Sequence, residues 1–305
     1  MELNKRTKVM ITGCGGMLGA SVYERFNREC KVFASDIDTN ESWLEYLDVR
    51  NFDSVMKETL KFQPDLMINL AALTDLEYCE EHQEESWLTN AMGQENICLA
   101  AQKVNATVVY ISTAGIFDGK QDSYNDFDAP NPLSIYAKSK YYGELTTQRM
   151  IRQYYVFRAG WMMGGGTHKD KKFINKIFKQ IKDGEKELFV VEDKLGTPTY
   201  TNDFAESMFK IVETDYYGLY NMVCQGAGSR HDVACEFLQC LGLSDKIKIT
   251  IVDSDYFNKE YYAPRPSSEK LINLKLANRG LLFMRHWKTC LAEYSKVFKK
   301  DLYND

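Results

Sequence analysis

The sequence predicts an α/β fold in which a parallel sheet is buried between helices. In the first half of the 305-residue chain, short apolar segments of strand length alternate with longer segments of helical spacing. This alternation is typical of βαβ units, which place their strands parallel in one sheet. A glycine-rich turn after the first strand and an acidic residue after the second strand support the same class.

The elements of the first half follow from the two kinds of spacing. Continuous apolar runs indicate strands buried on both faces of the sheet. They lie at Val9–Thr12, Val32–Ser35, Leu66–Ala72, Thr107–Thr113 and Tyr155–Arg158. Helical spacing falls between them, at residues 17–28, 51–62, 91–104 and 136–153.

The alternation becomes less regular beyond Gly160, which predicts a domain boundary there. We expect one domain over residues 1–160 and a second over 161–305, with a segment near 195–215 returning to the first. Helices are expected at Lys171–Asp183, Asn202–Glu213, Ser229–Leu241 (ended by Gly242) and Trp287–Lys300. Strands are expected at Leu188–Val191, Gly218–Met222 and Ile247–Val252.

Composition excludes several classes of function. The chain is 44% hydrophobic and 27% charged, as in ordinary globular proteins, and its net charge of −5 argues against wrapping a nucleic acid. We find neither a signal peptide nor a membrane-spanning segment, so a cytoplasmic enzyme or binding protein is expected. The eight cysteines form no CxxC pair or Cys/His cluster, so no metal site is expected.

The turn after the first strand, ITGCGGMLG, has the chemistry of a phosphate-binding loop. Its Gly13, Gly16 and Gly19 follow a GxxGxxG spacing, because Leu18 occupies the position at which GxGxxG has its last glycine. Glycines here allow a tight turn and let backbone N–H groups of the loop, which includes Met17, approach a pyrophosphate. A purely structural turn is the alternative.

Asp36 ends the second strand about 20 residues further on, where a carboxylate can accept hydrogen bonds from the adenosine ribose of a dinucleotide. A carboxylate there disfavours a 2′-phosphate, so NAD is expected over NADP. The nearby Asp38 could hold the same role, and Asp36 could instead be a turn residue.

Two further motifs carry the chemistry of carbonyl reduction. The strand over 107–113 ends in the hydroxyls of Ser112 and Thr113, and Tyr136 and Lys140 follow at i and i+4, on one face of a helix. A lysine ammonium beside the tyrosine is expected to lower the tyrosine pKa and make it a better acid–base catalyst. An exposed Tyr/Lys pair without function is the alternative.

These motifs, in this order, resemble the extended short-chain dehydrogenase/reductase superfamily through TGCGGMLG, Asp48-Val49, NLAA (69–72), IST (111–113) and YAKSK. More narrowly, the chain resembles the dTDP-4-dehydrorhamnose reductase family through PDLMINLAALTDLEYCE, STAGIFDG, FRAGWMMG, EDKLGTPTYTNDFA and RPSSEKL. The resemblance implies a Rossmann doubly wound parallel sheet with a smaller α/β C-terminal substrate-binding domain. It also implies reduction, by NAD(P)H, of the 4-keto group of a nucleotide-linked 6-deoxy sugar, in an enzyme that is often a homodimer.

The resemblance also implies residue roles. Tyr136 would protonate the carbonyl oxygen, Lys140 would lower the Tyr136 pKa and hold the nicotinamide ribose, and Thr113 would hydrogen-bond the carbonyl. Other cofactor contacts would come from Asp48, Val49, Ala71, Ala72 and Ser112, and substrate contacts from Thr74, Trp161 and Arg265. Trp161 as a core aromatic residue and Arg265 in a surface ion pair are the alternatives.

Two departures from the family pattern affect specificity. The family's Asp-Tyr after the threonine is here Ala114-Gly115, and the segment AGWMMGGGTHKDKKF differs from the usual loop beside the substrate. We therefore expect the reductase chemistry to be kept and the sugar to differ. An NAD-dependent epimerase or dehydratase, and a non-catalytic subunit like that of methionine adenosyltransferase, remain as alternatives.

Overall fold

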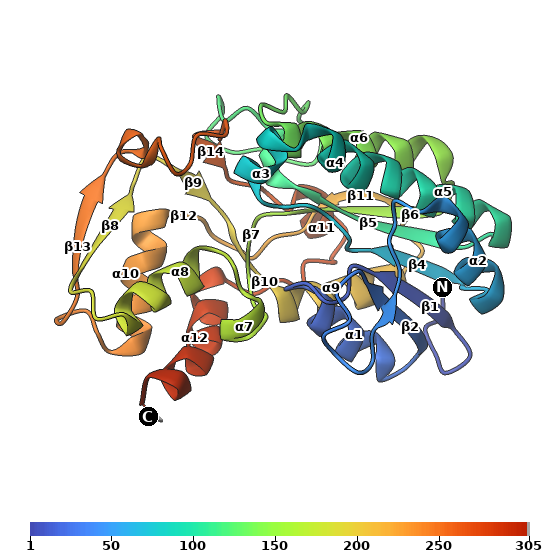
Figure 1. The fold of residues 1–305 in the computed structure, drawn as a ribbon, viewed down its shortest axis with the longest axis horizontal. Helices are drawn as coiled ribbons and strands as arrows, with labels where there is room; N and C mark the ends of the chain where they lie inside the picture. The colour runs from blue at the N-terminus through green and yellow to red at the C-terminus, as the bar shows by residue number, and fades with distance from the viewer. Residues whose placement is uncertain (304–305) are drawn as a thin grey trace.

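The computed structural model describes residues 1–303 and contains a seven-stranded parallel sheet at its centre (Figure 1). The strand order is β3-β2-β1-β4-β5-β6-β11. Chain connections run in opposite directions from β1 and β4, so the carboxyl ends of these two strands form the switch point at which such sheets bind ligands. The strands are β1 (Lys8–Thr12), β2 (Lys31–Asp36), β3 (Glu45–Tyr46), β4 (Leu66–Asn69), β5 (Thr107–Thr113), β6 (Tyr154–Ala159) and β11 (Gly218–Asn221).

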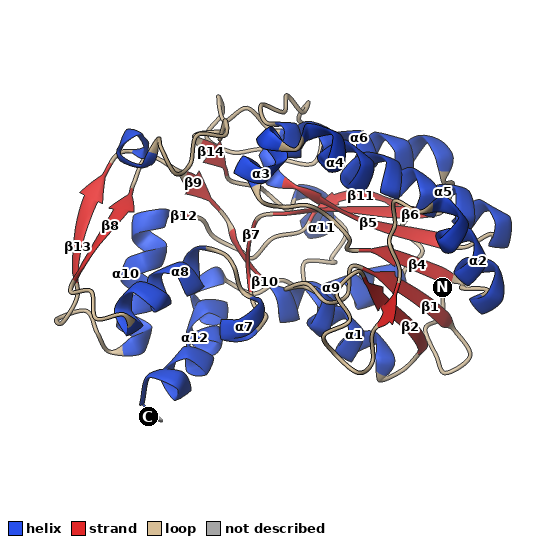
Figure 2. Cartoon of the chain, viewed as in Figure 1, coloured by secondary structure: helices blue, strands red, loops and turns tan. Residues whose placement is uncertain are grey.

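Helices cover both faces of this sheet, as Figure 2 shows. One face carries α1 (Gly19–Asn27) and α9 (Thr201–Val212), which are joined by a 2.7 Å hydrogen bond from Ser21 to Asn202. The other face carries α2 (Phe52–Phe62), α3 (Leu76–Glu81), α4 (Gln83–Trp87), the π-helix η1 (Leu88–Met92), α5 (Gly93–Val104) and α6 (Ile135–Met150). The predicted α/β class with a Rossmann-type parallel sheet is thus confirmed.

The second part of the molecule is smaller and lies beyond the carboxyl ends of the strands (Figure 1). Its helices are α7 (Gly166–Lys169), α8 (Phe173–Lys182), α10 (Arg230–Leu241) and α12 (Trp287–Tyr303), while α11 (Leu274–Asn278) packs near β11. Its strands are β7 (Trp161–Met163), β8 (Glu187–Val191), β9 (Leu195–Gly196), β10 (Pro198–Tyr200), β12 (Gly228–Ser229), β13 (Lys248–Val252) and β14 (Ser268–Glu269). Two short 3-10 turns, η2 (Ala114–Ile116) and η3 (Ser254–Phe257), complete the structure.

Local sequence explains where several helices begin and end. Ser134 caps α6 by accepting a hydrogen bond from the N–H of Ala137, and Ser229 and Asp232 form a capping box at the start of α10. Gly242 ends α10 in the left-handed conformation with φ of +74°, as its position after the apolar pattern predicts.

Differences from the expected elements lie at their ends, in very short elements, and in the helical stretch formed by α3, α4 and η1, which was not expected before residue 91. The expected strand over Leu66–Ala72 ends at Asn69, because the Asn69 side chain accepts the N–H of Ala71 at 3.0 Å and turns the chain out of the sheet. Strands of two or three residues, such as β3, β9 and β14, are too short to show an apolar period.

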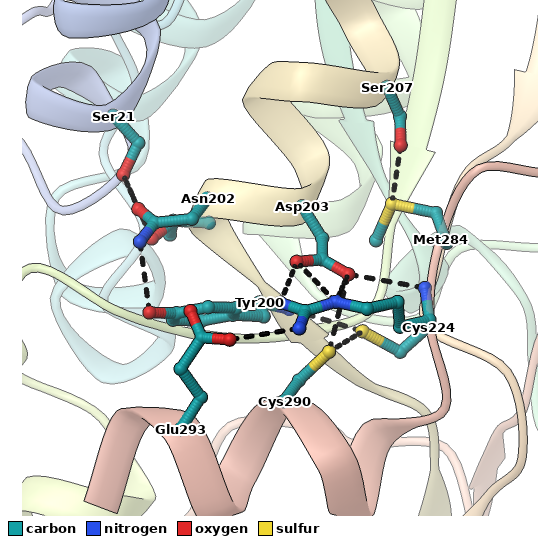
Figure 3. Close-up of polar contacts among 11 residues, drawn as sticks. Ser21, Tyr200, Asn202, Asp203, Ser207, Cys224, Met284, Cys290 and Glu293 are labelled. Carbon is teal, nitrogen blue, oxygen red and sulfur yellow. Dashed lines mark hydrogen bonds and ion pairs between the residues drawn. The ribbon is translucent and has the colours of Figure 1, made fainter. Parts of the chain in front are cut away.

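A polar network joins the sheet to the second part through Asp203 on α9 (Figure 3). Arg285 donates to Asp203 (Nε to Oδ2, 2.9 Å) and to Glu293 on α12 (Nη1 to Oε2, 2.9 Å). The Sγ atom of Cys290, also on α12, lies 3.4 Å from Oδ2 of Asp203 and 3.7 Å from Sγ of Cys224. Both α9 and β11 follow residue 160 in the chain, yet β11 is a strand of the central sheet and α9 packs beside α1. The domain boundary near residue 160 stays a prediction.

No helix within residues 1–303 combines the length and apolar character needed to cross a membrane. Over the same residues, no group of three or more His, Cys, Asp or Glu side chains is placed to hold a metal ion. The cytoplasmic location stays a prediction.

Candidate active site

The glycine turn after β1 is built for close backbone approach. Gly13 has φ of +72°, and a Cβ on it would collide with the backbone of Ala71, which follows β4. A Cβ on Gly19 would collide with the backbone of Cys14. Gly16 is exposed, and a Cβ there would meet only the Gly13 carbonyl oxygen, at 3.5 Å. Two of the three glycines are therefore required by packing, and the third leaves the turn open to a ligand.

Asp36 is tied directly to this turn. Its Oδ2 accepts the N–H of Gly15 at 2.8 Å, and its Oδ1 accepts the N–H of Asp38 at 3.0 Å. The carboxylate of Asp38 instead accepts from Nδ2 of Asn40 at 3.1 Å. Of the two candidate acids, Asp36 is thus the one held against the glycine loop.

The other predicted cofactor residues lie around the same edge of the sheet. Asp48 forms an ion pair with Arg50 (2.7 Å), and this hydrogen-bonded partner lowers the Asp48 pKa. Val49 is buried, and its side chain packs against Gly93 at the start of α5. Ala71 and Ala72 are partly buried in the segment after β4. The Ser112 hydroxyl, at the end of β5, is buried and has no hydrogen-bond partner among the described residues.

Thr113 and Tyr136 meet at the carboxyl end of β5. Thr113 is the last residue of that strand, and its Oγ1 accepts the N–H of Gly115 at 3.1 Å. Tyr136 lies in the first turn of α6, which Ser134 caps. Burial raises the pKa of Tyr136 to about 12, while a hydrogen bond with Thr113 acts to lower it.

Lys140 lies one turn further along α6 and is 4% exposed. Its Nζ lies 4.2 Å from the centre of the Tyr110 ring, and the Tyr110 hydroxyl donates to the Lys140 carbonyl at 3.1 Å. Burial lowers the Lys140 pKa to about 7, while the negative charge of Glu144 acts to raise it. The expected lowering of the Tyr136 pKa is therefore not met: burial dominates that pKa, and Lys140 is not among the groups that shift it.

Asn90 is a positioning residue that the sequence analysis missed. It lies in the π-helix η1, where its Oδ1 accepts the N–H of Leu73 (2.9 Å) and its Nδ2 donates to the Leu73 carbonyl (3.0 Å). Its own carbonyl accepts from the Tyr110 hydroxyl at 3.3 Å. A π-helical turn is rare and often marks a functional site, but a single asparagine in a helical sequence does not predict it.

The predicted substrate residue Trp161 begins β7 and is only partly buried. Its Nε1 donates to Oε2 of Glu269 at 2.7 Å, and its ring lies against Gly196, where any Cβ would collide with it. The guanidinium carbon of Arg230 lies 3.5 Å from the centre of the indole ring. Burial lowers the pKa of Arg230 to about 10, and the charge of Glu269 opposes that shift. The sequence analysis did not single out Glu269 or Arg230, both of which contact Trp161.

The other two predicted substrate residues have protein partners. Arg265 forms a two-pronged ion pair with Glu77 (2.7 and 2.8 Å), as its alternative interpretation supposed. Thr74 is exposed, and Nζ of Lys172 reaches both its carbonyl (3.0 Å) and its hydroxyl (3.2 Å). These two contacts connect the second part of the molecule to the segment after β4. Of the three predicted substrate residues, Trp161 is the one that has neither an ion pair nor a lysine contact among residues 1–303.

Comparisons with known proteins agree with this arrangement. The family model described as "RmlD substrate binding domain" matches residues 7–300. The spore coat polysaccharide biosynthesis protein SpsK of Bacillus subtilis is 29% identical over 289 residues, covering 94% of this chain and 96% of SpsK. The beta subunit of methionine adenosyltransferase 2 from Danio rerio is 25% identical, covering 77% of this chain and 74% of that protein.

Two solved structures superpose on nearly the whole chain. A dTDP-4-dehydrorhamnose reductase from Clostridium acetobutylicum has a TM-score of 0.87 and 32% identity, covering 96% of this chain and 100% of that chain. A dTDP-4-dehydrorhamnose reductase from Bacillus anthracis in complex with NADP has a TM-score of 0.86 and 28% identity, covering 95% and 98%.

Proposed function

We propose that this chain, which belongs to the RmlD substrate binding domain family, reduces the 4-keto group of a nucleotide-linked 6-deoxy sugar with a nicotinamide cofactor. The observation that carries the proposal is the hydrogen bond between Thr113 and Tyr136 at the carboxyl end of β5, with Lys140 one turn further along α6. Trp161 lies in the second part of the molecule and offers a surface for the sugar nucleotide there. The names of the similar dTDP-4-dehydrorhamnose reductases support the substrate class.

The residues present fit a dinucleotide. The open position at Gly16 and the unpaired, buried hydroxyl of Ser112 leave backbone and side-chain groups free for it, and Asp36 is fixed beside the turn. When bound, the cofactor would supply the hydride. The glycine turn (Gly13, Gly16, Met17, Leu18, Gly19), Asp36, Asp48, Val49, Ala71, Ala72 and Ser112 are the residues that we propose hold it.

The side chains around the carbonyl supply the proton. Tyr136, with a pKa near 12, keeps its proton at neutral pH and can donate it to the carbonyl oxygen as negative charge develops there. The Thr113 hydroxyl donates a second hydrogen bond to the same oxygen. Lys140, where protonated, would stabilise the tyrosinate that remains and would be one of the residues that hold the nicotinamide ribose. The carbonyl carbon gains a hydride and its oxygen a proton, which gives the alcohol.

We propose NADH as the preferred cofactor because the Asp36 carboxylate is held beside the turn and repels a 2′-phosphate. The similar Bacillus anthracis protein is in complex with NADP, and the ratio of kcat/KM for NADH and NADPH tests the preference in this chain.

A panel assay tests the function. Purified protein is mixed with NADH or NADPH and with dTDP-, GDP-, CDP- and UDP-linked 4-keto-6-deoxy sugars, and nicotinamide absorbance is followed. We expect oxidation of the cofactor with at least one sugar. No oxidation with any of them would contradict the proposal.

The similarity to the Danio rerio subunit supports one competing function, a non-catalytic partner of a methionine adenosyltransferase. In that case the protein would bind a nucleotide, oxidise no cofactor in the panel, and co-elute with the catalytic subunit of such an enzyme.

We also propose a homodimer, as the resemblance implies. Three large side chains on α4, η1 and α6 are exposed by 37–46% and could be covered by a second copy: Trp87, Met92 and Tyr142. Size-exclusion chromatography with light scattering measures the mass directly, and a monomer at all concentrations would contradict this.

A further inference from the structure

Glu269 is fixed in the site by contacts from the second part of the molecule. It ends β14, which pairs in parallel with β9 so that Glu269 lies opposite Gly196. The Trp161 ring packs against Gly196, and its Nε1 holds Oε2 of Glu269 at 2.7 Å. The carboxylate therefore has one oxygen anchored and a defined orientation.

The second oxygen of this carboxylate points to the space beside the catalytic residues. A Cβ built on Gly115 would lie 3.3 Å from Oε1 of Glu269 and 3.5 Å from Oγ1 of Thr113. A Cβ there would be tight against Oε1, so the lack of a side chain at Gly115 is what lets the Glu269 carboxylate lie this close to Thr113. Among residues 1–303, no donor hydrogen-bonds to Oε1. A partly buried carboxylate oxygen of this kind is an acceptor available to a ligand.

The charged groups around Glu269 are consistent with its carboxylate contacting the substrate. The charge of Glu269 acts to raise the pKa of Tyr136, which places the carboxylate within electrostatic range of the proton donor. The Arg230 guanidinium, stacked on the Trp161 ring, already supplies a positive charge close to Glu269. The positive charge of Arg230 disfavours a further cation at Oε1, which favours a neutral donor there.

We propose that Oε1 of Glu269 accepts a hydrogen bond from a hydroxyl on the sugar carbon next to the carbonyl, and so selects substrates that carry this hydroxyl. The inference rests on the proposed function, because Thr113 marks the position of the carbonyl oxygen. It also explains the departure at Ala114-Gly115: a carboxylate is absent from that segment, and Glu269 brings one to the same space from β14.

The test compares two sugar nucleotides that differ only in this hydroxyl. We would measure kcat/KM for a 4-keto-6-deoxyhexose nucleotide and for its analogue lacking the adjacent hydroxyl. A carboxylate that loses its hydroxyl donor when the analogue binds discriminates between the two sugars, so wild type should prefer the hydroxylated sugar by about 10-fold or more. Glu269→Ala should bring this ratio close to one, and Glu269→Gln, whose amide oxygen can still accept from Trp161, should give an intermediate ratio.

The matched control is Asp122→Asn. Asp122 pairs with Lys270, the neighbour of Glu269, at 2.8 Å, and lies at the surface, so this variant makes the same charge change away from the site. It should keep the wild-type ratio. An unchanged ratio in Glu269→Ala, or an equal loss in Asp122→Asn, would overturn the proposal, as would a wild-type preference for a sugar with an amino group in place of the hydroxyl.

Binding separates this proposal from the proposed function. Calorimetric titration of the two reduced sugar nucleotides, the alcohols, needs no turnover. If wild type oxidises no cofactor but binds the hydroxylated nucleotide more tightly, and Glu269→Ala loses that difference, the Glu269 proposal holds and the reductase function fails. If wild type binds neither compound, the Glu269 proposal is overturned as well.

Discussion

Glu144 and Arg158 form an ion pair whose side chains are 1% and 4% exposed, one helical turn beyond Lys140. Arg158, on β6, donates from Nη2 to Oε1 at 2.6 Å and from Nε to Oε2 at 3.1 Å. The pair fixes α6 on the sheet at the level of the proposed catalytic residues. Its negative member also acts to raise the pKa of Lys140.

Glu144→Gln should destabilise the protein strongly, because it leaves the buried Arg158 guanidinium without a counter-charge. Breaking a buried pair in this way costs about 3–5 kcal/mol. Chemical denaturation measures the loss. Glu24→Gln is the control, since Glu24 pairs with Arg28 at the surface (side chains 70% and 63% exposed), where the change should be about 1 kcal/mol or less. Equal losses of unfolding free energy in the two variants would show that the buried Glu144–Arg158 pair is no more important for stability than the surface pair.

The stability of the protein should rise with pH between about 7 and 10.5 through Lys140. The folded-state pKa of Lys140 is lowered by burial to about 7, while its usual value is 10.5. Between these values the unfolded state binds the proton and the folded state does not, so raising the pH favours folding. Denaturation at a series of pH values checks this: Lys140→Met should remove the rise, and Lys138→Met, at an exposed position, should keep it. The same dependence of stability on pH in wild type and Lys140→Met would show that Lys140 does not cause the rise.

Tyr136→Phe should reduce kcat by about 10²-fold or more while leaving cofactor affinity nearly unchanged, because only the proton donor is removed. Stopped-flow turnover and a fluorescence titration with NADH measure the two quantities. Tyr142→Phe, on the exposed side of α6, is the control and should keep wild-type turnover. Wild-type turnover in Tyr136→Phe would exclude Tyr136 as the acid.

Asp36→Asn should shift the cofactor preference toward NADPH. The variant removes the negative charge that opposes a 2′-phosphate and keeps an oxygen that can accept from the N–H of Gly15. The ratio of kcat/KM for NADH and NADPH is the measurement. Asp38→Asn, whose carboxylate accepts from Asn40 instead, should change the ratio less. A larger shift in Asp38→Asn would transfer the role to Asp38.

Much of the fold and part of the site could be predicted from the sequence. The parallel strands, the glycine turn and the Tyr136/Lys140 pair all follow from apolar periodicity or from short spacings within one element. Such signals survive in sequence because neighbouring residues in a helix or strand have fixed relative positions. Thr113 could be placed for the same reason, as the end of a long apolar strand.

The tertiary structure alone decided what surrounds these residues. Trp161 and Glu269 are 108 positions apart, and Glu77 and Arg265 are 188 positions apart, so no local period relates them. The pKa values of Tyr136 and Lys140 depend on burial by many distant segments, which is why the expected lowering of the Tyr136 pKa was wrong. The sequence by itself determined the order of the elements and the catalytic spacing. The packing of the second part of the molecule against the sheet determined which charged side chains lie beside Trp161 and Arg265, because only folding brings these distant side chains within hydrogen-bond distance.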